Sequence, residues 1–571
     1  MSDSVTHSAS LSEPLRASRW RPEWEVVALV LLVALVYFSR PFALPIFGEE
    51  PRRGVIAREM LETGDWIAPR VQGILRVSRP PLQNWMIAAG SVFSGRVDAL
   101  AVRLPSFLAT LATVLLVYLV GRGFLSRIAA TSAAVAYCTM HEVLQFGRLG
   151  ETEAVFTVFV ASSLLLWWHG RHSGWNPKLV WSIAFACTAM GTLTKGLQAP
   201  VYFVGITGSY LLLSGKWREL FGAAYWIGAV VGVSLVAAWQ IPFTLETSLS
   251  DSWQIYFWNV ANRFGERYWL PVIGHWISYP LEVLFGSLAP WSLLLAPLAS
   301  RRFRATLGAL TPHTQFLALC CLFALVFVWF PPGSRTRYYM PLYPCYALLV
   351  GVVMERLTAD GDAAAEWYWL AFRNLVTVVA AICGVAILAV SLAWPNALAA
   401  LPWSWALAYG TLCTVVVVVM LRSGHWAAER SLQAGVWAAA LFLGVTYAGP
   451  WLTVQGRRCE DVAASVAALR EELPPGSRLV SFGQLMHTFL FYYPETIDRF
   501  ELPETLAEVP ADLEYFSIHT YKTEPPELPF AWEQIAVVSC DRFQRPVPQD
   551  RIYVGRRIAP TTASTDEPQR R

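Results

Sequence analysis

Long apolar runs separated by short polar connections dominate the chain between residues 25 and 451. The first run, VVALVLLVALVYF, is followed by the charged stretch GEEPRRGVIAREMLETGDW. An apolar helix of about 20 residues can cross a hydrocarbon core of roughly 30 Å. The pattern predicts about thirteen membrane-spanning helices, at residues 25–43, 103–121, 128–146, 154–170, 178–193, 197–214, 219–241, 281–299, 314–331, 338–354, 371–393, 402–421 and 432–451.

The distribution of Arg and Lys predicts how these spans are oriented. Basic residues recur in alternate connections, including residues 121–127, 169–178 and 301–304. Cytoplasmic loops carry an excess of Lys and Arg, so the N-terminus is predicted to be cytoplasmic and the C-terminus periplasmic or extracellular. The remaining charged connections then lie together on the outer face of the plasma (bacterial inner) membrane. They are residues 44–102, 147–153, 194–196, 242–280 and 332–337.

The predicted fold class is an all-α polytopic membrane protein with a small C-terminal α/β domain on the outer face. Residues 1–24 form a cytoplasmic segment and residues 25–451 the transmembrane domain, whose outer loop 44–102 carries two short interfacial helices. Residues 452–558 alternate helix-like and strand-like patterns, and residues 559–571 form a polar, disordered tail.

Composition supports a membrane protein and adds one expectation about the tail. Hydrophobic residues make up 55% of the chain and charged residues 15%, against about 25% in soluble domains. The net charge of +3 gives no reason to expect a nucleic-acid partner. Cys459 and Cys540 are the two cysteines assigned outside the membrane, so a disulfide between them is predicted.

The first outer loop resembles that of polyprenyl-phosphate-sugar-dependent membrane glycosyltransferases. This family includes the lipid A aminoarabinose transferase and, more distantly, the protein O-mannosyltransferases. The matching loop reads GEEPRRGVIAREMLETGDWIAPRVQGILRVSRPPLQNWM, and later pieces that match are RLPS, ETEAVFTVF, LTKG, LAPWS and RYYMPLYP. The resemblance covers about residues 25 to 350 and implies a fold of the GT-C type.

The resemblance implies transfer of a sugar from a polyprenyl-phosphate donor to a lipid, protein or glycan acceptor on the outer face. Such chemistry needs a cationic clamp for the leaving phosphate and a carboxylate that takes the acceptor's proton. Glu49 is the expected general base, with Glu153 second. The expected phosphate-binding residues are Arg79, Arg263, Lys195 and Tyr338, and the supporting residues are Glu50, Arg52, Arg58, Glu151, His275 and Arg337.

The sequence departs from the family pattern at three of these positions and at Ser78. Glu49 and Glu153 stand where family members commonly have Asp, and Arg79 replaces a Lys. In the aminoarabinose transferase, a Glu just before that Lys and a His in a later outer loop hold zinc. Ser78 replaces this Glu, which would leave His275 without its usual co-ligand. We therefore expect no metal and no other cofactor.

Structural explanations exist for several of these residues taken singly. Glu49 and Glu50 are also typical of a solvated acidic loop, and Arg52 and Arg58 of lipid headgroup contacts. Acidic residues such as Glu151 and Glu153 favour a helix start in any protein. Two other functions stay open, a polytopic transporter and a non-catalytic membrane scaffold of the cell envelope. A transporter would place charges near mid-span or show repeated halves, and the sequence shows neither.

Overall fold

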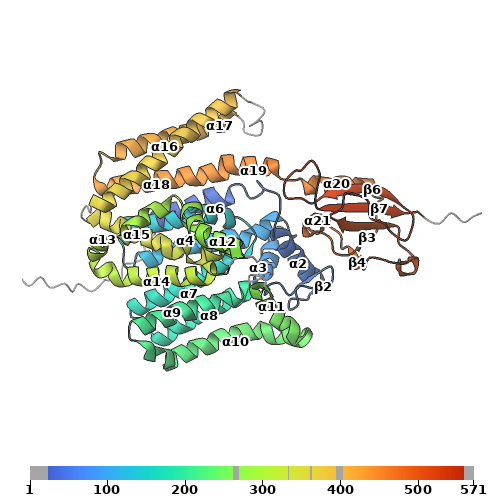
Figure 1. Cartoon of the computed structure of the whole chain (residues 1–571), viewed down its shortest axis with the longest axis horizontal. Coiled ribbons are helices and arrows are strands. Elements are labelled where there is room, and N and C mark those ends of the chain that lie inside the picture. The colour runs from blue at the N-terminus through green and yellow to red at the C-terminus, as the bar shows by residue number, and fades with distance from the viewer. Residues whose placement is uncertain (1–23, 262–268, 332, 360–362, 394–402, 559–571) are drawn as a thin grey trace, which may run out of the picture.

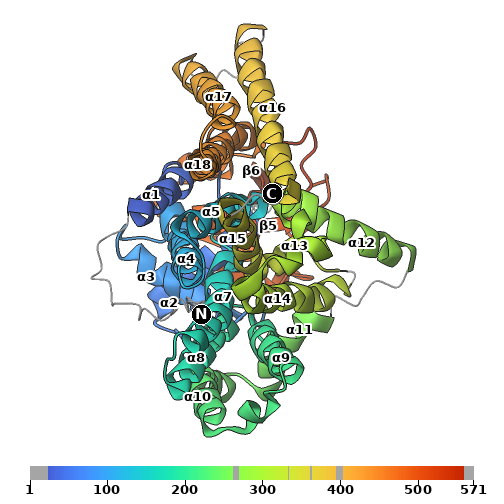
Figure 2. The ribbon, with the colours of Figure 1, turned by 90° about the vertical axis from the view of Figure 1, so that its left-hand side faces the viewer.

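The computed structural model consists of a large helical body with a small β-sheet at one end (Figure 1). It describes residues 24–261, 269–331, 333–359, 363–393 and 403–558. Helices α16 and α17 lie at one edge of the body and α10 at the opposite edge, as the view along the body also shows (Figure 2).

Within the described residues, eight helical segments are long and apolar enough to cross a membrane. Each coincides with a span predicted from the sequence, although several extend further. They are α4 (Ala99–Gly121), α7 (Thr152–His172), α10 (Ala223–Glu246), Gly308–Trp329 with α14 (Thr311–Trp329), Thr336–Thr358 with α15 (Tyr343–Ala359), Glu366–Ala393 in α16 (Ala363–Ala393), α17 (Trp403–Ser423), and Ala428–Arg458 with α18 (Ala428–Thr446) and α19 (Leu452–Arg458).

The other five predicted spans are helical but shorter, broken or less apolar, so the number thirteen stays a prediction. The 128–146 segment divides into α5 (Arg127–Thr139) and α6 (His141–Phe146), because Met140 between them has an extended backbone with ψ of 136°. The 281–299 segment divides into η4 (Glu282–Ser287) and η5 (Trp291–Ala299). The remaining three contain α1 (Trp24–Val33) with η1 (Ala34–Phe38), α8 (Pro177–Lys195) and α9 (Gln198–Leu213).

The loop between the first two predicted spans folds into two short helices joined by a hairpin. Helix α2 (Glu50–Thr63) ends at Gly64, whose φ of +74° lies in the left-handed region that favours glycine. Strands β1 (Arg70–Val71) and β2 (Ile74–Leu75) pair antiparallel, and α3 (Leu82–Ser91) follows. Both helices form where the sequence predicts short helices rather than spans.

The C-terminal region contains a five-stranded mixed sheet with strand order β4-β3-β5-β7-β6. Strands β3 (Leu479–Phe482), β4 (Asp498–Phe500) and β5 (Tyr515–Thr520) run parallel, and β6 (Trp532–Ser539) and β7 (Arg551–Arg557) are antiparallel to their neighbours. Helices α20 (Val462–Glu472) and α21 (His487–Tyr492) accompany the sheet.

Helix α2 packs directly against this C-terminal region. Val55, Ile56 and Met60 belong to one apolar core with residues of α20, α21 and the sheet. The guanidinium of Arg58 donates to the backbone carbonyls of Leu490, at 2.6 Å, and Tyr493, at 3.1 Å. The C-terminal region therefore covers the helices of the first loop, and both lie at the same end of the helical body (Figure 1).

The predicted disulfide between Cys459 and Cys540 is absent, and both thiols are free and buried. Cys459 pairs in an antiparallel bridge with Phe543, three residues beyond Cys540. Placement outside the membrane was therefore too weak a criterion for pairing these cysteines.

Candidate active site

Charged residues from five separate segments converge at the end of the helical body that carries α2 and α3. They come from the start of α2, the stretch before α3, the starts of α7 and of η7 (Thr336–Leu342), and the end of α8. Helix α8 ends at Lys195 because Gly196 leaves helical geometry with a φ of +94°. We call the set of Glu49, Arg52, Arg53, Arg76, Arg79, Glu151, Glu153, Lys195 and Arg337 the charged cluster.

The centre of the charged cluster is a network of buried ion pairs. The Nζ of Lys195 lies 2.9 Å from Oε1 of Glu153, and both side chains are almost fully buried. Arg337 contacts two carboxylates, with Nη1 at 2.5 Å from Glu151 and Nε at 3.6 Å from Glu153. Because ion pairs at this depth are weakly screened, each partner fixes the position of the next.

Arg79 and Tyr338 border this network. The guanidinium of Arg79 donates to the backbone carbonyl of Lys195 at 3.2 Å. The Nζ of Lys195 lies 4.9 Å from the centre of the Tyr338 ring. The structure thus brings together three of the predicted phosphate-binding residues, whereas the fourth, Arg263, lies outside the described residues.

Glu49 sits at the start of α2 and is the most exposed carboxylate of the charged cluster. Its side chain is 39% exposed, compared with 4% for Glu153 and 6% for Glu151. It pairs with Arg52 and, at 3.5 Å, with Arg53. Glu49 is therefore the carboxylate in the cluster that a molecule arriving from solvent reaches most easily.

The surroundings shift the pKa of Glu151 strongly. Burial, together with the negative charge of Glu153, raises the pKa of Glu151 to about 7, although Arg337 opposes the shift. Burial and the like charges of neighbouring arginines also lower the pKa of Arg52 to about 9. Arg52 stays charged at neutral pH. The lowering of its pKa results from burial and from the other arginines packed close to it.

Several predicted supporting residues have structural partners instead. Glu50 is fully buried and forms a bidentate ion pair with Arg103, at 2.8 and 2.9 Å. Arg58 joins α2 to α21 and lies 3.9 Å from Glu62. His275, on α12 (Trp269–Leu281), contacts the carbonyl of Trp329 at 3.1 Å. For Glu50 and Arg58, these contacts agree with roles in holding the loop in place.

Sequence reasoning did not single out Arg76, Gln83 or Asn84. Arg76 belongs to the charged cluster, because its positive charge lowers the pKa of Arg52 and of His487. Gln83 and Asn84 are fully buried in α3. The position of Gln83 and Asn84 directly after the family-like RPPL motif was the available signal.

The described residues contain no group of three or more His, Cys, Asp or Glu side chains arranged to hold a metal ion. Ser78 and His275, the positions related to the zinc pair of the aminoarabinose transferase, belong to different elements. Whether the protein needs a metal or another cofactor stays a prediction from the sequence.

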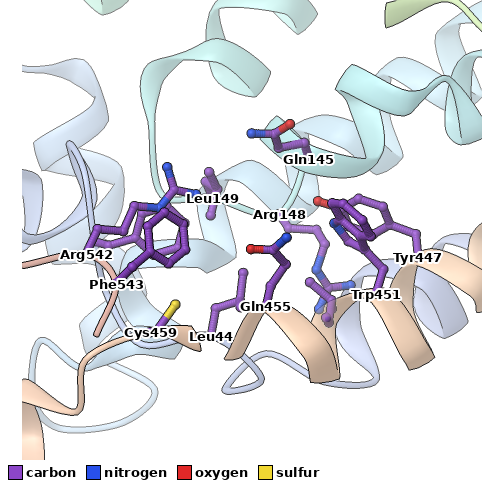
Figure 3. A pocket seen from close by; sticks show the side chains of 12 residues that line it. Leu44, Gln145, Arg148, Leu149, Tyr447, Trp451, Gln455, Cys459, Arg542 and Phe543 are labelled. Atoms are coloured by element: carbon purple, nitrogen blue, oxygen red, sulfur yellow. The ribbon is translucent and has the colours of Figure 1, made fainter. Parts of the chain in front are cut away.

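A separate cavity of about 250 Å³ lies beside the segment that leads to Glu151 (Figure 3). Its lining includes Arg148, Trp451 and Arg542, which come from the loop after α6, from η8 (Tyr447–Trp451) and from the C-terminal region. No residue of the charged cluster lines it. The cavity and the charged cluster are therefore distinct features.

Sequence comparison relates the chain to lipid-phosphate-dependent glycosyltransferases. The family described as dolichyl-phosphate-mannose-protein mannosyltransferase matches residues 78–241. The undecaprenyl phosphate-alpha-4-amino-4-deoxy-L-arabinose arabinosyl transferase 1 of Pseudomonas fluorescens is 30% identical over 355 residues, 61% of this chain and 60% of that protein. The corresponding Pseudomonas aeruginosa transferase is 32% identical over 330 residues, 56% of this chain and 57% of that protein. The aligned region thus spans less than two thirds of the length of either relative.

Structural comparison shows that the fold is shared over nearly the whole chain. The crystal structure of ArnT from Cupriavidus metallidurans bound to undecaprenyl phosphate aligns with a TM-score of 0.66 and 17% identity, over 93% of this chain and 98% of that one. The apo structure of the same protein gives a TM-score of 0.64. The chain is thus a multi-pass membrane protein with the fold of ArnT, and its resemblance to the polyprenyl-phosphate-dependent glycosyltransferases, predicted from the first outer loop, is confirmed.

Proposed function

We propose that this protein transfers a sugar from a polyprenyl-phosphate donor to an acceptor hydroxyl at the outer surface of the membrane. The observation that carries the proposal is the buried network of Glu153, Lys195 and Arg337 with Arg79 beside it. Arg79, Lys195 and Arg337 come from distant segments and lie close enough together to contact one phosphate group. The relatives' names and the undecaprenyl phosphate bound to ArnT agree with this assignment.

The leaving phosphate binds to Arg79, Lys195 and Arg337 in this proposal. The guanidinium fork of an arginine binds two phosphate oxygens and stays charged, and the ammonium of Lys195 adds a compact point charge. Charge accumulates on the phosphate as its bond to the sugar breaks, so preorganised cations stabilise the transition state more than the donor. Glu153 acts as a positioning residue that holds Lys195.

Glu49 is the proposed general base. Its carboxylate takes the proton of the acceptor hydroxyl as the acceptor oxygen bonds to the anomeric carbon of the sugar. The bond from that carbon to the phosphate oxygen breaks, and the polyprenyl phosphate leaves as an anion. The exposure of Glu49 supports this role, whereas the buried ion pair of Glu153 with Lys195 argues against Glu153 as the base.

The charge pattern of the sequence supports the proposed outer-face location. The loops that form the charged cluster are those that alternate with the basic loops predicted to be cytoplasmic. In this proposal the acceptor, whether lipid, protein or glycan, approaches from the outer side, at the end of the helical body that carries the C-terminal region (Figure 1).

The test is release of polyprenyl phosphate. Purified protein is incubated with a panel of polyprenyl-phosphate sugars and candidate acceptors, and free polyprenyl phosphate is measured by mass spectrometry. We expect release from at least one donor by the native protein and little release by Arg79→Ala. A native protein that binds donors but releases polyprenyl phosphate from none of them would contradict the proposal.

A further inference from the structure

Two neighbouring amide side chains are buried beside the charged cluster without partners. Gln83 and Asn84 lie in the first turn of α3, and both are 0% exposed. None of their four side-chain nitrogen and oxygen atoms has a hydrogen-bond partner among the described parts of the chain. A buried amide without partners destabilises a fold, and most such groups in native proteins are satisfied by protein, water or ligand.

Helical spacing shows which neighbours the Gln83 side chain has. Residues three and four positions apart share a helix face, so Gln83 lies on the face of Met86 and Ile87. Met86 packs against Ala154 and Val155 at the start of α7. Ile87 packs in a core with residues of α2 and α4. Gln83, one turn earlier on the same face, is therefore flanked by α2 and α4 on one side and by the start of α7 on the other.

Asn84 is placed in the same way. It shares a face with Ile87 and Ala88, which pack in a core with Ala57 of α2. One turn before Ala57, α2 carries the buried Arg53, whose charge interacts with those of Glu151 and Glu153. The two amides thus border the charged cluster where α2 and the start of α7 contribute residues to it.

The charge balance of the cluster constrains what can bind next to these amides. The cluster contains six cationic and three acidic side chains. A polyprenyl-phosphate sugar brings one negative charge on its phosphodiester, which still leaves an excess of positive charge. A protonated amine on the sugar would be repelled there, whereas hydroxyl groups would not.

We propose that Gln83 and Asn84 form the sugar subsite, and that this subsite selects a neutral, hydroxyl-rich sugar over a cationic amino sugar. Each amide offers two donor hydrogens and an acceptor oxygen, which matches hydroxyl groups that both donate and accept. Arg79 precedes α3 by only two prolines, so the sugar lies beside the phosphate clamp. The inference rests on the proposed transferase function and deepens it.

The experiment separates recognition of the sugar from recognition of the phosphate. Full-length protein in nanodiscs is titrated with undecaprenyl phosphate and with undecaprenyl phosphate carrying glucose, galactose, mannose or 4-amino-4-deoxyarabinose, and binding is measured by native mass spectrometry. For at least one neutral hexose, we expect affinity about tenfold above that for undecaprenyl phosphate, as one or two satisfied buried amides would give. The amino sugar should give no such gain.

The variants test the two residues directly. The double variant Gln83→Leu/Asn84→Leu replaces unpartnered buried amides by apolar side chains, so its unfolding temperature should match or exceed that of the native protein. It should bind undecaprenyl phosphate normally but lose the tenfold gain from the neutral sugar. Gln455→Leu, which removes an amide on α19 outside the charged cluster, is the matched control and should keep both affinities.

Three outcomes would overturn the inference or its foundation, and they are distinguishable. A double variant that retains the native preference for a neutral sugar removes these residues from the subsite. A native protein that binds undecaprenyl phosphate but gains nothing from any neutral hexose, or prefers the amino sugar, overturns the proposed selectivity. A native protein that binds none of these lipids contradicts the proposed transferase function itself.

Discussion

Glu153 and Lys195 form a buried ion pair across two helices, with 2.9 Å between Oε1 and Nζ. They are 42 residues apart and come from the start of α7 and the end of α8. Because the two helices run in opposite directions between these residues, their pairing fixes the turn around Gly196 against the start of α7. The Glu153–Lys195 ion pair therefore holds α7 and α8 together and also positions Lys195 within the charged cluster.

Removing one partner of this pair should destabilise the protein more than removing both. Glu153→Gln leaves the Lys195 ammonium buried without its main partner, which typically costs about 3–5 kcal/mol. The double variant Glu153→Gln/Lys195→Met should recover a large part of that loss, because no charge is left unpaired. Thermal unfolding in detergent measures both. Equal destabilisation by the single and the double variant would show that the pair is not coupled.

Glu151 should make stability depend on pH. Its pKa in the folded protein, raised to about 7 by burial and by Glu153, exceeds the ordinary value of 4.5. The folded state therefore holds a proton that the unfolded state releases, and stability falls as pH rises from about 4.5 to 7. The loss is about 3 kcal/mol at most.

The control for this pH dependence is Glu62, a more exposed carboxylate on α2. Glu151→Gln should flatten the decrease in unfolding temperature between pH 5 and pH 8, whereas Glu62→Gln should leave it unchanged. An unaltered slope in Glu151→Gln would mean that another group carries the proton.

The contact between α2 and α21 should depend on the absence of a side chain at Gly54. A Cβ placed there would lie 2.5 Å from the Phe491 ring, well inside van der Waals contact. Gly54→Ala should therefore loosen the C-terminal region and speed hydrogen exchange in α21. Gly208→Ala, in α9, meets nothing within 4 Å and is the matched control. Unchanged exchange in Gly54→Ala would show that Phe491 moves aside freely.

The two C-terminal thiols should be separately modifiable. Cys459 and Cys540 are buried and free, so alkylation under denaturing, non-reducing conditions should label both. Peptide mapping without reductant is the measurement. A linked pair of peptides containing these two residues would contradict the free thiols of the structure.

The sequence predicted the parts of this protein that depend on local pattern or on a family motif. The apolar runs located the long helices, and the LTKG motif pointed to Lys195 before its partner was known. The break at Met140 was missed because residues that a helix accepts stand on both sides of it, with no Gly or Pro to indicate a change in backbone direction.

Contacts between distant segments were the part that pattern could not supply. Glu50 and Arg103 are 53 residues apart, and no pattern in either segment predicts their bidentate ion pair. Arg58 was interpreted from the sequence as a supporting residue or a lipid headgroup contact, yet its guanidinium donates to carbonyls more than 430 residues away. Roles assigned to single charged residues depended on partners that only the fold provides.

The central claim is that the charged cluster is a glycosyl-transfer site with Glu49 as its base, and Glu49→Gln tests it most directly. Donor binding and single-turnover release of polyprenyl phosphate are measured for the native protein, for Glu49→Gln, and for Glu62→Gln as a control on the same helix. We expect Glu49→Gln to bind the donor but to release polyprenyl phosphate about 10²–10⁴ times more slowly, the usual loss for a general base, while Glu62→Gln matches the native rate. Full turnover in Glu49→Gln would contradict the account.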